Sequence, residues 1–136
     1  MRLLIDAGLC CRTLEQRLKE AEIAPESLDG ILITHEHTDH VGGLDRFVKK
    51  YHTPVFANYN TAAVIEHMCR RERHEAPEFT FFESGLPFML GDLTITPVPI
   101  PHDTAEPVAY VLDDGAHRLG YFTDLGHVND LVAQAL

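Results

Sequence analysis

The sequence predicts an α/β fold with a mixed sheet, and the order of its patterns supports this class. Before residue 79, short apolar runs alternate with segments of helical periodicity, which is typical of parallel strands joined by helices. From Phe79 onward, strand patterns follow one another across short turn signals, which is typical of antiparallel hairpins. A length of 136 residues suits one domain, so we expect a single domain over residues 1–136.

Three strands and two helices are predicted up to residue 57. The strands are residues 2–6, 30–34 and 55–57. Thr13 and Gln16 have the spacing of a capping box, and the helix that they would begin carries one apolar face, made by Leu14, Leu18 and Ala21. A short helix before Pro54 is indicated by apolar residues at helical spacing, namely Leu44, Phe47 and Val48.

The remaining elements are a third helix, five strands and a helix at the chain end. Asn60 or Thr61 can cap the third helix, which would reach Arg71 and bury Val64, Ile65 and Met68. The first strand is residues 79–82. Two hairpins follow, with strands at 88–90 and 93–98 around Gly91-Asp92, and at 108–112 and 118–122 around residues 113–115. Residues 128–135 are expected to be helical.

A dense group of candidate metal ligands follows the strand at residues 30–34. Residues 34–40 read Thr-His-Glu-His-Thr-Asp-His, and their ligand types are imidazole and carboxylate. His35, His37 and Asp39 are spaced by two, so an extended backbone would point them to one side, and His40 follows where the chain turns. This ligand chemistry suits zinc, iron or manganese rather than calcium or magnesium. The alternative is a polar loop without an ion, which so ordered a cluster disfavours.

Composition excludes several classes of protein. No apolar stretch approaches the roughly 20 residues that span a bilayer, and no signal peptide opens the chain, so we expect a cytoplasmic protein. Three cysteines, Cys10, Cys11 and Cys69, do not make a disulfide framework. A formal net charge of −10 argues against a broad surface for nucleic acid, although a nucleic-acid substrate stays possible.

The motif at His35, His37, Asp39 and His40 resembles the H-x-H-x-D-H motif of the metallo-β-lactamase superfamily of hydrolases. Three more stretches match the family in order: residues 3–8, with Asp6 as support for the metal loop; residues 99–103, with a third-motif histidine, His102; and residues 120–126, with a bridging aspartate, Asp124. The resemblance implies an αββα sandwich, here in an incomplete version. Relatives have an additional strand pair at the start and a further histidine after the bridging aspartate, both missing here.

The resemblance also implies two divalent metal ions and hydrolysis by a metal-activated hydroxide. Zinc is expected, with manganese or iron as alternatives. The first site would draw on His35, His37 and His102, with Asp124 as the bridge. The second would draw on Asp39, His40 and Asp124, and would be weaker because it lacks the distal histidine. Asp39 would also orient the attacking water, which makes it the candidate catalytic residue.

Each assignment has a plainer alternative. Asp6 can cap the turn after its strand, His102 can be an exposed loop histidine, and Asp124 can be a turn residue. His127, three residues after Asp124, is expected at a helix entry rather than among the ligands. Four histidines lack ligand spacing and are expected at the surface or in packing: His52, His67, His74 and His117.

The context of His102, residues 100–104 (Ile-Pro-His-Asp-Thr), is similar to the phosphodiesterase and exonuclease-like branches rather than to the Gly-His-Thr context of thioesterases and lactamases. We therefore expect a phosphodiester substrate. Two alternatives stay open. One is a thioester, lactone or small-ester substrate, which the acidic charge suits better. The other is an inactive metal-binding fragment, stabilised by self-association.

Overall fold

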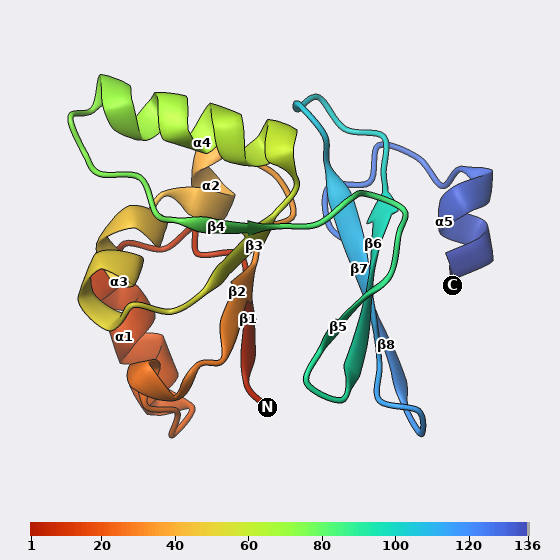
Figure 1. The fold of residues 1–136 in the computed structure, drawn as a ribbon, viewed down its shortest axis with the longest axis horizontal. Coiled ribbons are helices and arrows are strands. Elements are labelled where there is room, and N and C mark those ends of the chain that lie inside the picture. The colour runs from red at the N-terminus through yellow and green to blue at the C-terminus, as the bar shows by residue number, and fades with distance from the viewer. Residues whose placement is uncertain (136) are drawn as a thin grey trace.

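A computed structural model describes residues 1–135, and it has four layers (Figure 1). Helices cover one sheet, this sheet faces a second sheet, and the last helix covers the outer side of the second sheet. The elements in chain order are β1 (Leu3–Ile5), α1 (Cys11–Glu20), the 3₁₀ turn η1 (Pro25–Ser27), β2 (Gly30–Leu32), α2 (Thr38–Val41), α3 (Leu44–Tyr51), β3 (Val55–Ala57), α4 (Tyr59–Arg71), β4 (Phe79–Phe81), β5 (Phe88–Leu90), β6 (Leu93–Pro99), β7 (Val108–Asp113), β8 (Arg118–Tyr121) and α5 (Asp130–Ala135).

The two sheets differ in strand direction. The first has the order β1-β2-β3-β4, and all its pairs are parallel. The second has the order β5-β6-β7-β8, and all its pairs are antiparallel. The α/β class and the αββα sandwich are thus confirmed, whereas the two directions are kept in separate sheets instead of being mixed within one. Helical connections of sufficient length permit the parallel pairs. Tight turns join β5 to β6 and β7 to β8, and the longer loop of residues 100–107 joins β6 to β7.

Alternation along the strands builds the three cores between these layers. On β2, Ile31 packs among the helices, while Leu32 faces the second sheet. On β7, Tyr110 lies between the sheets, while Ala109 packs on Val132 of α5. Both faces of these central strands are buried, which explains why they are continuous apolar runs in the sequence.

Helix starts differ most from the predictions. The capping box is wrong, because α1 begins at Cys11, two residues before Thr13, and no side chain caps it. Asn58 caps α4, not Asn60 or Thr61: its side chain accepts a hydrogen bond from the backbone N–H of Thr61. The buried face of α4 also differs from the predicted one: it consists of Thr61, Ala62, Ile65 and Cys69, whereas Val64 and Met68 are half-buried. Among residues 1–135, no helix has both the length and the apolar character to cross a membrane.

Candidate metal centre

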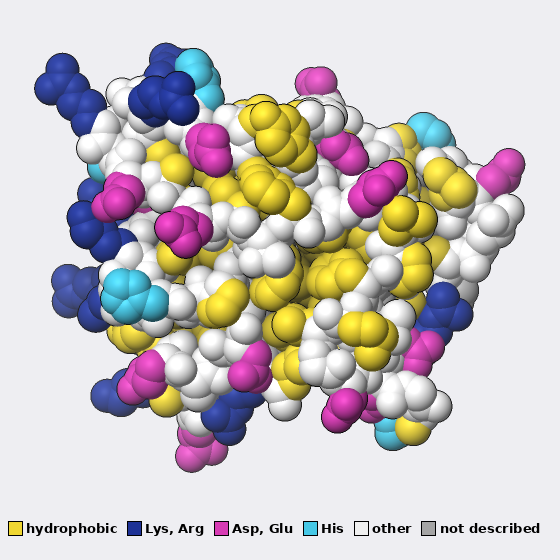
Figure 2. Space-filling model, in the orientation of Figure 1, with side chains coloured by type: hydrophobic (Ala, Val, Ile, Leu, Met, Phe, Trp, Pro, Cys, Tyr) yellow, Lys and Arg dark blue, Asp and Glu magenta, His cyan; other side chains and the backbone are white. Residues whose placement is uncertain are grey.

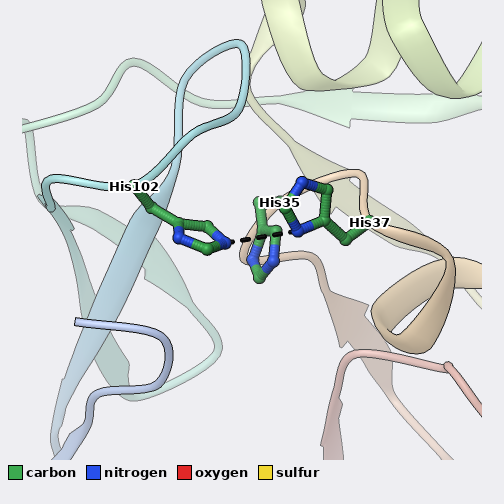
Figure 3. A group of neighbouring side chains, drawn as sticks. All are labelled: His35, His37 and His102. Atoms are coloured by element: carbon green, nitrogen blue, oxygen red, sulfur yellow. Dashed lines mark hydrogen bonds between the residues drawn. The ribbon is translucent and has the colours of Figure 1, made fainter. Parts of the chain in front are cut away.

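Three histidines from two loops converge beyond the carboxyl end of β2 (Figure 3). His35 and His37 lie between β2 and α2, and His102 lies between β6 and β7. Their ring nitrogens are within 4.8 Å of one another, and Nε2 of His102 is 3.2 Å from Nδ1 of His37. His35 is fully buried and His37 is exposed, so the group forms a site that is closed on one side and open on the other.

A second group shares His35 and adds His40 and Asp124. The Oδ2 atom of Asp124 is 2.9 Å from Nε2 of His40 and 3.8 Å from Nε2 of His35. Asp124 follows β8 and has a left-handed backbone (φ 53°), which turns its carboxylate toward His40. Five of the six predicted ligands therefore meet at one place.

Asp39 is the predicted ligand that stays outside both groups. The expectation of an extended backbone through this residue is wrong, because Thr38–Val41 forms one helical turn, α2. This turn packs closely on the residues that follow β1. The N–H of Gly43 donates to the carbonyl of Ala7, and the N–H of Ala7 donates to the carbonyl of His40. The Asp39 side chain is 76% exposed, with Oδ2 3.5 Å from Nε2 of His40.

The carboxylate of Asp6 holds the loop after β2 and the His40 ring in place by hydrogen bonds. Its Oδ1 accepts from the backbone N–H of Thr34 (2.8 Å), and its Oδ2 accepts from the Thr34 hydroxyl (2.7 Å) and from Nδ1 of His40 (2.7 Å). The alternative that Asp6 caps the turn after its strand is not supported, since the hydrogen bonds of its carboxylate among residues 1–135 go to Thr34 and His40. Asp6 is buried and has φ 62°, which points its carboxylate at the loop after β2.

Protonation of His35 and His40 is controlled by opposite effects. Burial, followed by the neighbouring imidazoles of His40, His102 and His37, lowers the pKa of His35 to about 4, so His35 is neutral at pH 7. Burial also opposes the charged form of His40, but its hydrogen bond to Asp6 and the nearby carboxylates outweigh burial and raise its pKa.

One atom, Nε2 of His35, shows how the donor set fits a metal ion. This atom is buried and has no hydrogen-bond partner among residues 1–135, while Nδ1 of the same ring lies 2.9 Å from the Thr34 hydroxyl. Leaving a buried nitrogen without a partner costs free energy, and a metal ion would satisfy it. Neutral imidazoles with a carboxylate are the donors that zinc and similar ions take, so the residues fit such an ion.

The comparisons with known proteins identify the family. A family described as a β-lactamase superfamily domain matches residues 1–136. The chain belongs to this superfamily. It is 36% identical over 129 residues to exodeoxyribonuclease YycJ of Bacillus anthracis (95% of this chain, 48% of the relative), and 35% identical over 134 residues to exodeoxyribonuclease WalJ of Streptococcus pneumoniae (97% and 49%). The chain thus spans about half the length of these curated relatives.

A solved metallo-β-lactamase of Cronobacter sakazakii, with a HARLDQ motif, superposes with a TM-score of 0.70 at 20% identity, covering 88% of this chain and 52% of the other. At this identity the likeness concerns the fold alone. The metallo-β-lactamase fold implies that divalent metal is bound, commonly zinc, which agrees with the donor groups around His35.

Within this superfamily domain, the sequence motifs did not reveal two residues that fix the metal loops. Glu36 is buried, and its Oε1 accepts from the backbone N–H of Ala105 (2.8 Å), which joins the loop after β2 to the loop of His102. Tyr110 donates its hydroxyl to the carbonyl of Ile33. A charged residue between two ligands is the signal that could have indicated Glu36, whereas Tyr110 is one apolar strand residue among several.

The other histidines lie away from the centre, as predicted. His74 pairs with Asp45 (2.7 Å), His117 is exposed beside Asp114, and His52 and His67 are exposed. His127 is exposed and belongs to neither donor group of the described residues.

Proposed function

We propose that this chain carries the metal centre of a metal-dependent hydrolase that cleaves phosphodiester bonds, in the manner of a nuclease. The observation that carries the proposal is the convergence of five donors, with a buried, unpartnered Nε2 of His35 at their middle. The choice of bond is supported by the names of the two exodeoxyribonucleases to which 95% and 97% of this chain align.

The proposal includes two divalent ions, with zinc expected and manganese or iron as alternatives. His35, His37 and His102 would hold one ion, and His40, Asp124 and Asp39 would hold the other. Bound ions of this kind supply a hydroxide nucleophile at neutral pH and offset the charge that develops on a phosphodiester. The second set is expected to bind its ion more weakly than the first, since its carboxylates, Asp39 and Asp124, are exposed, whereas His35 of the first set is buried.

The protein's own groups would perform three further tasks. Asp6 and Thr34 orient the imidazoles of His40 and His35 through the hydrogen bonds described above. Glu36 keeps the His102 loop against the loop after β2. Asp39 has an exposed carboxylate, which would orient the attacking water toward the substrate and accept a proton from it.

The test compares His37→Ala with a matched control, His67→Ala, which removes an exposed histidine of α4. We expect His37→Ala to abolish hydrolysis of a chromogenic phosphodiester while circular dichroism shows an intact fold, and His67→Ala to leave turnover unchanged. Undiminished turnover by His37→Ala would remove the metal mechanism.

A parallel assay on a thioester and a dinucleotide decides the bond. Preference for the thioester would replace the phosphodiester assignment with the small-ester alternative. Metal bound without any hydrolysis would support an inactive metal-binding protein, for which self-association would be measured by light scattering.

A further inference from the structure

Two large aromatic side chains are exposed at the edge of the first sheet from which the loop of His35 starts. Tyr59, the first residue of α4, is 70% exposed, and Phe81, the last residue of β4, is 54% exposed. Their ring centroids are 5.7 Å apart, and the planes are tilted by 49°. Figure 2 shows hydrophobic side chains gathered on the surface where α4 begins and β4 ends. Water contact at two large rings is costly, so a ligand that covers them would gain free energy.

The topology brings this aromatic pair to the edge of the sheet that carries the metal ligands. Parallel strands place their carboxyl ends at one edge, where ligands of such sheets bind. From this edge β2 continues to His35, β3 continues to Tyr59, and β4 ends at Phe81.

Hydrogen bonds connect the two residues beside Tyr59 to the loop of His102. The side-chain N–H₂ groups of Asn58 and Asn60, on either side of Tyr59, donate to Glu106 at its carbonyl and at Oε2, each at 2.7 Å. The preceding residue, Ala105, donates to Glu36 of the metal motif. The start of α4, which carries Tyr59, is therefore joined through residues 105 and 106 to the loop of His102 and to the metal motif.

Both rings stand on a fixed backbone. Asn58 is buried and caps α4, with a further hydrogen bond to Ser84. Phe81 is paired with Ala57 on β3, and the N–H of Phe82 donates to the carbonyl of Ala57. A rigid aromatic surface loses little conformational entropy when it binds a planar ligand.

We propose that Tyr59 and Phe81 form a base-stacking platform for a single-stranded segment of nucleic acid whose phosphodiester reaches the metal centre. This inference rests on the proposed function. Stacking on aromatic rings accepts any base, because every base has a π-face, and it adds affinity beyond that of phosphate contacts. It therefore suits a chain with a formal net charge of −10, in which clustered Lys and Arg cannot supply most of the affinity. Asn60 and Glu106 provide a polar border for the sugar and base edges.

The test compares two phosphorothioate-linked oligonucleotides of equal length and equal charge, one of thymidines and one of abasic units. Binding to the metal-loaded protein is measured by fluorescence anisotropy. We expect the thymidine strand to bind about tenfold more tightly than the abasic strand. This ratio corresponds to the usual free energy of stacking one base on an aromatic side chain.

Variants then locate the preference. Tyr59→Ala and Phe81→Ala should each reduce affinity for the thymidine strand several-fold and leave that for the abasic strand unchanged, whereas Tyr59→Phe should retain it. Leu119→Ala on β8, another exposed apolar residue (62%), is the control without effect.

The outcomes separate this inference from the proposed function. Equal binding of both strands by the parent overturns the platform, whatever the protein hydrolyses. Loss of affinity for both strands in Tyr59→Ala overturns it too, since phosphate contacts would then be responsible. A thymidine preference without hydrolysis of any phosphodiester supports the platform and removes the proposed activity. A change of oligomeric state in Tyr59→Ala, with no thymidine preference in the parent, assigns the pair to self-association instead.

Discussion

The hydroxyl oxygen of Thr34 lies 2.9 Å from Nδ1 of His35 and 2.7 Å from Oδ2 of Asp6. A hydroxyl has one proton, and the carboxylate of Asp6 can only accept it. The hydroxyl oxygen must then accept the Nδ1–H of His35, so the lone pair of this ring is on Nε2, which faces the other donors. Asp6 thus sets the tautomer of buried His35, a proposed metal ligand, through Thr34.

The first prediction removes this hydroxyl. Thr34→Val keeps the shape of the side chain, and we expect it to lower the affinity of the first metal site by about 10- to 100-fold, the usual effect of losing a hydrogen bond to a ligand. Thr34→Ser, which restores the hydroxyl, should bind nearly as well as the parent. Competition with a chromogenic chelator measures both, and equal affinity in Thr34→Val would contradict this role of Thr34.

The sequence was sufficient to predict the strands from local patterns, and to predict the layered fold and the meeting of the donors from the resemblance of its motifs to the metallo-β-lactamase superfamily. Apolar runs and turn signals gave every strand to within two residues, because alternation and turn chemistry are local properties. It was not sufficient for Asp39, whose i, i+2 spacing suggested an extended chain. The turn α2 is fixed by backbone hydrogen bonds to Ala7, more than thirty residues earlier in the chain, and such a contact leaves no periodic signal.

The supporting residues show the same limit. The role of Glu36 could not be predicted from its place between His35 and His37, because its partner Ala105 lies in the loop between β6 and β7 of the second sheet. The exposed pair of Tyr59 and Phe81 was similarly hidden, since neither the start of α4 nor the end of β4 carries a sequence signal for exposed aromatic side chains. In both cases the partner is distant in sequence, and its identity depends on tertiary structure. The packing of the two sheets joins Glu36 to Ala105, and the pairing of β3 with β4 joins Tyr59 to Phe81.

The second prediction concerns Gly8, which lies against the turn that carries Asp39. A Cβ atom at Gly8 would lie 1.6 Å from the carbonyl oxygen of Asp39, and this neighbour is backbone that cannot rotate away. We expect Gly8→Ala to destabilise the fold by several kcal/mol, on the order of a severe steric or strained substitution. Chemical denaturation measures the change. The control is Gly126→Ala, whose Cβ would be in ordinary contact at 3.6 Å from the Pro101 carbonyl, and a loss of similar size there would contradict the steric explanation.

The third prediction is a pH dependence of the metal-free protein. Folded His35 has its pKa lowered to about 4, against an ordinary value of 6.5. Above pH 6.5 the residue is neutral in both states and has no effect. As pH falls from 6.5 toward 4, the unfolded chain takes up a proton that the folded chain does not, so folding is destabilised by up to about 3 kcal/mol.

His40 acts in the opposite direction, because its raised pKa favours the folded state at low pH. The measurement is therefore a difference: the free energy of unfolding in EDTA at pH 7 and pH 4.5, for the parent and for His35→Asn. The parent should lose more stability on acidification than the variant. The same loss in both would show that His35 does not resist protonation.

The last prediction concerns unequal metal affinity. Each imidazole offers one nitrogen to the centre, so an ion held by His35, His37 and His102 leaves the second ion with His40 and two carboxylates. These are Asp124, 37% exposed at its side chain, and Asp39, 76% exposed. Exposed carboxylates are poorly preorganised, and fewer imidazoles weaken a zinc site. We therefore expect one ion to remain after dialysis and the second to leave first.

Metal content after dialysis, measured on the parent, His40→Ala and His127→Ala, checks this expectation. His40→Ala should retain one ion. His127 lies outside both donor groups of the described residues, so His127→Ala should behave as the parent does. Selective loss of the second ion in His127→Ala would show that this imidazole joins the site when metal is present. If the parent and His127→Ala both held two ions tightly, exposed carboxylates would suffice to hold the second ion. The prediction of unequal affinity would then be wrong.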